Sequence, residues 1–392
     1  MRSRTSVVVA LGTAQTLAWA SSFYLPAMLA APMAHDLGLQ AADIYGALSM
    51  ALLISALVSP WAGRSIDQFG GRRVLLASGE LFALALTLLG LAQGAVTMLL
   101  AWVVMGLAMG LGLYDAAFAA LVRLFGADAR KAITGITLVA GFASTVGWPL
   151  SALMESLWGW RGACFGWVAL HLLLGLPLNL WLPRVASPTT APEMPHMATG
   201  DTASAAVPRG RFVVVALLFA LMGFVSTSVA THLPTLLLAS GMSVTAAVAM
   251  AALAGPSQVA ARLLELGLLS RHSPLLAARL ATLGHPLGAL CLLAGPLGAL
   301  PFVVLHGMGN GLLTIVRGTL PLALFGAQGY GARQGWIALP GRLLGALAPW
   351  LLGLVLARWG VGALWLTGAL ALAALATLLL LHLPTTPPAA KR

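Results

Sequence analysis

The chain has 392 residues, of which 60% are hydrophobic and only 8% are charged. A soluble domain carries about 25% charged residues, so this composition excludes a globular protein that folds in water. The formal net charge of +11 would suggest nucleic-acid binding in a soluble protein, but no basic stripe interleaves with aromatic residues here, so we expect no nucleic-acid partner.

Apolar runs follow one another along the chain. They are continuous rather than alternating and exceed the roughly 18 residues of a membrane-spanning helix, which indicates an all-α membrane protein and excludes a β-barrel. The first run follows Arg2 and Arg4 without a clean cleavage site, so we expect a retained helix rather than a signal peptide. We predict about twelve spanning helices, at residues 6–32, 42–63, 73–94, 97–125, 132–157, 161–182, 211–238, 243–269, 274–295, 298–326, 334–357 and 360–383.

The segment 184–210 differs from the rest because it is rich in Pro, Ser, Thr and Gly. It predicts a linker between an N-terminal bundle (1–183) and a C-terminal bundle (211–392). Basic residues gather in alternate loops, which are cytoplasmic by the positive-inside rule, so the linker and both termini are expected in the cytoplasm. These basic residues are Arg2, Arg4, Arg72, Arg73, Arg130, Lys131, Arg184, Arg209, Arg211, Arg271, Arg333, Lys391 and Arg392.

The two halves of the sequence repeat. A shift of 200 residues places Leu-Phe-Gly-Ala at 124–127 on the same four letters at 324–327, and Pro149 on Pro349. Several such matches in order indicate two pseudo-symmetric six-helix bundles. Parallel repeats of this kind place a substrate path between the halves, near the middle of the membrane.

The segment 63–73, Gly-Arg-Ser-Ile-Asp-Gln-Phe-Gly-Gly-Arg-Arg, lies between the second and third predicted helices. It resembles the signature loop of the major facilitator superfamily, roughly Gly-x-x-x-Asp-x-x-Gly-x-Arg-Arg. The resemblance implies two bundles that rock about a central site in alternating access, with Asp67 holding the start of the eleventh helix, near Gly335, in one conformation. The expected gating residues are Gly63, Arg64, Asp67, Gly70, Arg72 and Arg73, with Arg262 and Glu265 as a degenerate second copy.

Two features depart from the family pattern. The family often has an arginine in the fourth helix, four residues before a glycine, and this chain has Trp102 there, before Gly106. The Gly/Pro-rich motif that drug antiporters carry in the fifth helix is matched only in part, by Gly141, Gly147 and Pro149.

Ionisable residues at membrane depth are costly and are functional hypotheses by default. We expect Asp115, in the fourth helix, to carry a proton or to be a fixed counter-ion to Arg317 or another arginine. The tenth helix places His306, Asn310, Thr314 and Arg317 on one face, as either a cavity lining or a set of helix–helix hydrogen bonds. The other expected pathway residues are Arg342, His232 and Gln15.

These residues predict a secondary active transporter of a small organic solute, with protons as the coupling ion and no cofactor or metal. Arginines in the C-terminal half favour an organic anion, since their guanidinium groups bind carboxylates bidentately. Efflux of a drug or metabolite is the alternative. A membrane-embedded enzyme is disfavoured because the sequence has no His-Glu-x-x-His, Gly-x-Ser-x-Gly or Walker motif, and a non-transporting scaffold would not need ionisable residues at this depth. We expect a monomer in a bacterial inner membrane.

Overall fold

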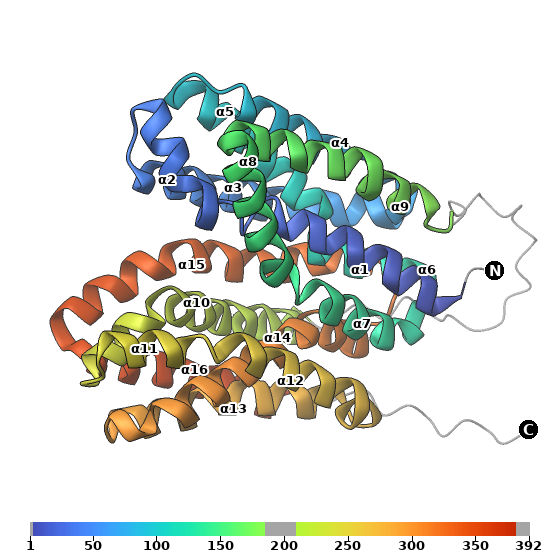
Figure 1. Ribbon diagram of the computed structural model, residues 1–392. Helices are drawn as coiled ribbons and strands as arrows, with labels where there is room; N and C mark the ends of the chain where they lie inside the picture. Colours follow the sequence, from blue (N-terminus) through green and yellow to red (C-terminus); the bar gives the residue numbers. More distant parts are fainter. Residues whose placement is uncertain (1–2, 185–208, 382–392) are drawn as a thin grey trace, which may run out of the picture. The chain divides into compact units, whose positions relative to one another are not determined.

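The computed structural model describes residues 3–184 and 209–381, and these residues form helices and short connections without a strand (Figure 1). The prediction of an all-α protein is confirmed. The predicted linker, 184–210, lies almost entirely outside the described residues. The α-helices are α1 (Arg4–Ala20), α2 (Pro26–Leu37), α3 (Ala41–Phe69), α4 (Gly71–Gly90), α5 (Ala95–Gly112), α6 (Tyr114–Phe125), α7 (Arg130–Ala140), α8 (Ala143–Leu170), α9 (Leu176–Trp181), α10 (Arg209–Ala239), α11 (Val244–Ala251), α12 (Ala254–Gly267), α13 (Pro274–Leu293), α14 (Ala299–Phe325), α15 (Tyr330–Trp359) and α16 (Ala363–Leu379).

Several predicted helices are broken into two. The run predicted at 6–32 forms α1 and α2, because Pro26 has no N–H to continue the hydrogen-bond ladder and takes the first position of a new helix. The hydroxyl groups of Ser21 and Ser22 donate to the carbonyl oxygens of Leu17 and Ala18, at 2.8 and 2.5 Å. The carbonyl oxygen of Leu17 also accepts from the backbone N–H of Ser21 at 3.0 Å, so side chains and backbone together satisfy the end of α1.

The run predicted at 97–125 is broken in its middle. Leu113 has extended backbone (φ −80°, ψ −170°) between the end of α5 and the start of α6. The side-chain amide of Gln15 donates to the carbonyl oxygen of Gly112 at 2.5 Å. A break at membrane depth is tolerated where protein groups satisfy the freed backbone in this way.

Two predicted connections coincide with turns that need glycine. Gly70 separates α3 from α4 with φ +84°, and Gly159, at the predicted boundary between the fifth and sixth helices, has φ +69° inside α8. Residues other than glycine rarely adopt these angles. Beyond the kink at Gly159, α8 passes into a short π-helix at His171–Gly175 and then into α9.

The chain divides into two compact units. The N-terminal unit combines the residues up to 206 with Gly329–Ala346, and the C-terminal unit combines 207–328 with the residues from Leu347 onward. α15 is therefore shared: its first half packs in the N-terminal unit and its second half in the C-terminal unit.

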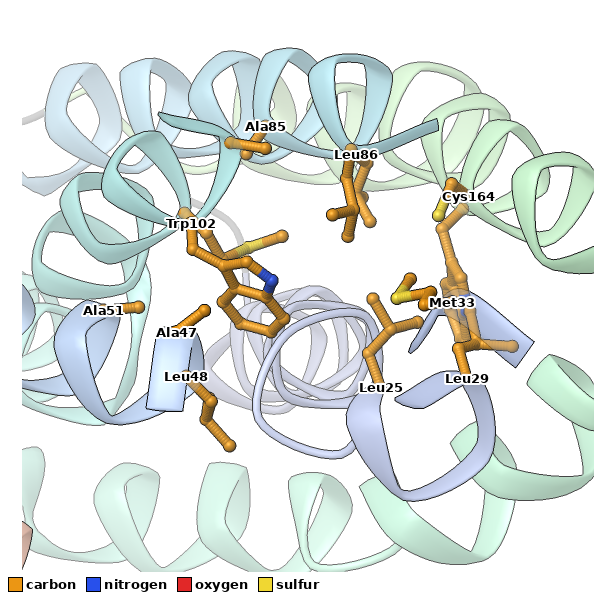
Figure 2. Close-up of a cluster of buried hydrophobic side chains, with 14 of the residues drawn as sticks. Leu25, Leu29, Met33, Ala47, Leu48, Ala51, Ala85, Leu86, Trp102 and Cys164 are labelled. Carbon is orange, nitrogen blue, oxygen red and sulfur yellow. The ribbon is translucent and has the colours of Figure 1, made fainter. Parts of the chain in front are cut away.

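The core of the N-terminal unit is apolar and closely packed. Figure 2 shows Trp102 of α5 among side chains of α2, α3, α4 and α8, including Leu48 and Leu86. The Trp102 side chain is fully buried. The position at which the family resemblance implies an arginine is thus part of the hydrophobic core in this chain.

Equivalent helices of the two units pack through glycines with equal spacing. A Cβ on Gly106 of α5 would lie 2.7 Å from the carbonyl oxygen of Ala51 on α3, and Gly110 packs one turn further along the same helix. In the other unit, a Cβ on Gly307 of α14 would lie 2.9 Å from the carbonyl oxygen of Ala254 on α12, and Gly311 packs one turn further along. Small residues four apart allow membrane helices to approach closely.

Seven helical segments are long and apolar enough to cross a membrane, counting the described residues only. The longest, Ala95–Trp181, has 87 residues and Tyr330–Leu379 has 50. A crossing needs about 20 residues, so these two segments contain several crossing lengths each. The count of twelve crossings stays a prediction that is consistent with these lengths.

Candidate functional site

The first polar centre of the N-terminal unit is an ion pair. The Nη2 atom of Arg342, in the first half of α15, lies 2.5 Å from Oδ2 of Asp115, and both side chains are largely buried, with 26% and 14% exposed. Gln334 donates from Nε2 to the other carboxylate oxygen at 3.3 Å. The sequence predicted Arg317 or another arginine as the counter-ion of Asp115, and in the structure Arg342 is paired with it.

Asp115 owes its place to the break in the predicted fourth helix. It lies in the first turn of α6, directly after the extended residue Leu113. The first N–H groups of a helix lack partners within the helix and create a positive potential there, which favours a carboxylate. Discontinuous helices expose such termini within the membrane, where transporters commonly bind their ligands.

Arg342 also binds α3. Its Nη1 atom donates to the hydroxyl oxygens of Ser55 and Ser59, at 3.0 and 2.7 Å, and to the carbonyl oxygen of Ser55 at 3.3 Å. One guanidinium group thus links α15 to both α3 and α6. Ser55, Ser59 and Gln334 are not among the residues predicted from the sequence. Their signal was spacing, since Ser55 and Ser59 are one turn apart on α3 and Gln334 lies eight residues before Arg342 on α15.

The second polar centre is the start of α15. The carboxylate of Asp67 accepts hydrogen bonds from the backbone N–H groups of Gly331 and Ala332, at 3.1 and 2.9 Å. A carboxylate that receives N–H groups at a helix N-terminus is stabilised by hydrogen bonding and by the helix dipole. Asp67 lies in the last turn of α3, so the predicted signature loop is mostly helical.

Glycines allow this approach of α3 and α15. A Cβ on Gly63 would overlap the carbonyl group of Gly331, and a Cβ on Gly335 would overlap Pro60. The Arg64 guanidinium lies 5.9 Å from the ring centroid of Trp336, within cation–π distance. Arg72 donates to the carbonyl oxygen of Leu182 at 3.4 Å, and Arg73 is exposed.

Gln15 lines a small cavity inside the N-terminal unit, with room for about one water molecule. Ser78, His171 and Asn179 also line it. Within the described part of the chain, Oε1 of Gln15 and Oδ1 of Asn179 are buried without a hydrogen-bond partner. His171 is held by Ser21, whose Oγ lies 2.8 Å from its Nε2.

In the C-terminal unit, the predicted stripe on α14 divides. His306 and Asn310 are hydrogen-bonded to each other at 3.0 Å, and they connect to His285 on α13 and to Ser226 on α10. The hydroxyl of Thr314 instead donates to the carbonyl oxygen of Asn310 in its own helix at 2.9 Å. His285 and Ser226 are not among the residues predicted from the sequence.

The remaining predicted residues occupy separate places in the C-terminal unit. Arg317 is half-buried on α14, one turn beyond Thr314. A ring nitrogen of His232 lies 2.8 Å from the carbonyl oxygen of Pro349. Arg262 and Glu265 are both buried on α12.

The helices are long and apolar, and some are broken at membrane depth. Both units pack through the same glycine spacing and contain buried ionic or polar groups. These features are those of a polytopic α-helical transporter. The sequence model of the Major Facilitator Superfamily matches residues 11–315, so the chain belongs to this family.

Solved structures of transporters from this superfamily have the same fold as this chain. The transporter FucP in its outward conformation has a TM-score of 0.75 at 14% identity, covering 95% of this chain and 98% of FucP. The proton:xylose symporter XylE has a TM-score of 0.72 at 15% identity, covering 95% of this chain and 94% of XylE. The human organic anion transporter MFSD10 has a TM-score of 0.69 at 17% identity, covering 96% of this chain and 100% of MFSD10. At these identities the similarity establishes the fold and leaves the substrate open.

Proposed function

We propose that the protein is a secondary active transporter that couples proton movement to the passage of a small organic solute by alternating access. The observation that carries this proposal is the Asp115–Arg342 pair. Arg342 lies on α15, whose first half belongs to one unit and whose second half belongs to the other. A charge change at this pair can therefore alter how one unit holds a helix that continues into the other.

The proton enters this scheme at Asp115. Protonation removes the negative charge of the pair and leaves Arg342 with serine oxygens as its partners. Breaking a buried ion pair costs about 3–5 kcal/mol, which is enough to shift a two-state equilibrium by more than a hundredfold. Asp67 also holds α15 in the N-terminal unit, because it accepts two hydrogen bonds from the start of that helix. We assign the gating role to this contact and to the glycines beside it.

An organic anion is the proposed solute class. Arg317 lies on the partly polar face of α14, and guanidinium groups bind carboxylates through two parallel hydrogen bonds. Among the proteins of the same fold, one is named as an organic anion transporter and another as a proton:xylose symporter. The location proposed is a bacterial inner membrane, with a monomer whose two termini are cytoplasmic.

The test uses the full chain in proteoliposomes with an imposed pH gradient. Candidate solutes are first ranked by thermal shift of the purified protein across organic acids, sugars and cationic drugs, since a bound ligand raises the stability of the native state. We expect an organic acid to give the largest shift and to accumulate when a proton gradient is imposed. Stabilisation by cationic or neutral apolar compounds alone would contradict the anion assignment and favour efflux of a drug.

The proton site is tested by Asp115→Asn in the same vesicles. We expect gradient-driven accumulation to be lost, while solute exchange in the absence of a gradient continues. Asp36→Asn is the matched control, since Asp36 pairs with Arg161 at 2.7 Å but both side chains are substantially exposed. Accumulation that survives Asp115→Asn would remove Asp115 as the proton carrier.

A further inference from the structure

The C-terminal unit contains a continuous chain of four hydrogen-bonding side chains from three helices. The Ser226 hydroxyl on α10 donates to Oδ1 of Asn310 at 2.5 Å, Nδ2 of Asn310 lies 3.0 Å from Nε2 of His306, and Nδ1 of His306 lies 2.9 Å from Nδ1 of His285. Both histidines are buried, whereas Asn310 and Ser226 are half-buried. The chain thus runs from a dry end at His285 to a more accessible end at Ser226.

The direction of these bonds determines where the protons are. An amide nitrogen only donates, so Nε2 of His306 accepts from Asn310 and carries no proton. A neutral His306 then has its proton on Nδ1 and donates it to Nδ1 of His285. His285 must in turn hold its proton on Nε2, which is buried and has no acceptor among the residues that the structure describes.

The same four groups can hold one more proton without losing a bond. If His306 gains a proton on Nε2, a half-turn of the Asn310 amide presents Oδ1 to that N–H, and Nδ2 then donates to the Ser226 oxygen. The bond from His306 to His285 is unchanged. A proton on Nδ1 of His285 would instead leave two donors facing each other at 2.9 Å. The chain therefore accepts a proton at His306 and rejects one at the Nδ1 atom of His285.

Among the described residues, the following neighbours of this part of α14 are uncharged. α12 presents Ala254 and Ser257 to Gly307 and Gln258 to Gly311, and Phe302 lies beside both rings. α11 and α16 have no ionisable residue. The other ionisable residues on these packed helices are Arg209, Arg211 and His232 on α10, Arg262 and Glu265 on α12, Arg279 and Cys291 on α13, and Arg317 on α14.

We propose that Nε2 of His306 is a proton-binding site of the C-terminal unit, with the Asn310 amide and the Ser226 hydroxyl as the switch that accommodates both protonation states. Its part in solute coupling rests on the proposed proton-driven transport, but proton binding itself does not. His285 is a positioning residue, since it accepts from His306 in both states. The site lies on α14 and is separate from the Asp115–Arg342 pair of the other unit.

The test is nuclear magnetic resonance of the full chain in detergent micelles, with ¹⁵N-labelled histidine and no solute. His306→Gln and His285→Gln assign two of the eight histidines, and His272→Gln, at an exposed connection, is the control for assignment. In mildly alkaline buffer we expect the proton of His306 on Nδ1 and that of His285 on Nε2. On acidification His306 should gain the second proton while His285 stays neutral. A proton on Nε2 of His306 in alkaline buffer, or protonation of His285 first, would overturn the proposal.

Variants of Asn310 keep the proposal testable if a histidine variant does not fold. Asn310→Asp can only accept, so at a fixed pH the ratio of charged to neutral His306 should rise at least tenfold, and Asn310→Leu should lower it. Thr314→Val, one turn along α14, should change the ratio less than twofold because its hydroxyl bonds its own helix. Equal ratios in the Asp and Leu variants would refute the switch. Since no solute is present, this measurement does not depend on whether the protein transports a solute. Proton-driven transport could likewise be shown even if His306 did not bind a proton.

Discussion

The two units of the molecule share a packing scheme and differ in their polar chemistry. In both, a helix with two glycines four residues apart packs on a neighbour, and the glycine pairs lie 201 positions apart in sequence (Gly106 and Gly307, Gly110 and Gly311). The N-terminal unit places an ion pair beside this packing, whereas the C-terminal unit places a hydrogen-bonded chain of uncharged side chains. The two units thus repeat helix contacts that depend on small residues, and they differ at their polar positions.

The largest expected effect concerns the ion pair. Arg342→Met leaves Asp115 buried without its cation, so we expect the free energy of unfolding to fall by about 3 kcal/mol. Removing both charges, in Asp115→Asn with Arg342→Met, should restore part of this loss, because no uncompensated charge remains. Thermal unfolding in detergent measures Asp115→Asn, Arg342→Met and the double variant.

The matched control is the Asp36–Arg161 pair, which has a similar distance, 2.7 Å, at greater exposure. Arg161→Met should cost less than about 1 kcal/mol, as is typical of surface pairs. If the two single substitutions at Asp115 and Arg342 simply add in the double variant, the pair does not act as a unit and the contrast between the two units of the molecule is lost.

The second effect concerns glycine packing and tests the shared scheme. A Cβ at Gly110 would meet Val58 and Ser55, and one at Gly311 would meet the backbone of Gln258. Forcing an extra methyl group into such contacts costs about 1–3 kcal/mol, so Gly110→Ala and Gly311→Ala should both destabilise the protein, and Gly311→Ala more because its nearest contact, at 2.4 Å, is with backbone. Gly46→Ala on α3 is the control, since it meets nothing within 4 Å and should stabilise the helix slightly. A cost confined to one unit would show that the repeat in sequence is not a repeat in packing.

The sequence predicted the helices and the individual polar residues better than it predicted which residues contact one another. Glycine, proline and long apolar runs determine where helices can lie, so all-α architecture, family and repeat followed from local patterns. Asp115 and Arg342 were each selected because a charge at membrane depth is costly. Their pairing joins residues 227 positions apart, and it depends on the break at Leu113, which lies within a continuous apolar run and is satisfied from outside by Gln15. Contacts of this kind leave no local signal, and the same is true of the bond between His285 and His306.

The third effect concerns the start of α15. Asp67→Asn keeps one acceptor oxygen and loses the charge, so we expect a loss of about 1 kcal/mol in the free energy of unfolding. Asp128→Asn is the control, because Asp128 is highly exposed and lies 3.9 Å from Arg4. If Asp67 holds α15 in one conformation, a cysteine at Ala332 should also react faster with a water-soluble thiol reagent in the Asp67→Asn background. Equal reaction rates in both backgrounds would argue against the gating role.

The smallest effect tests whether the N-terminal unit has an uncharged polar site of its own. Gln15 and Asn179 each leave one buried amide oxygen unpaired beside the same small cavity, and a single water that donates to both would satisfy them. Replacing one of them leaves that water with one fewer acceptor and also removes a hydrogen bond to a backbone carbonyl, that of Gly112 or that of Leu75, so Gln15→Met and Asn179→Leu should each cost about 1 kcal/mol. The double variant removes both oxygens and the need for the water, and should therefore cost less than the sum. A strictly additive double variant would mean that the two amides are independent, and the uncharged polar chain would then be a property of the C-terminal unit among the residues that the structure describes.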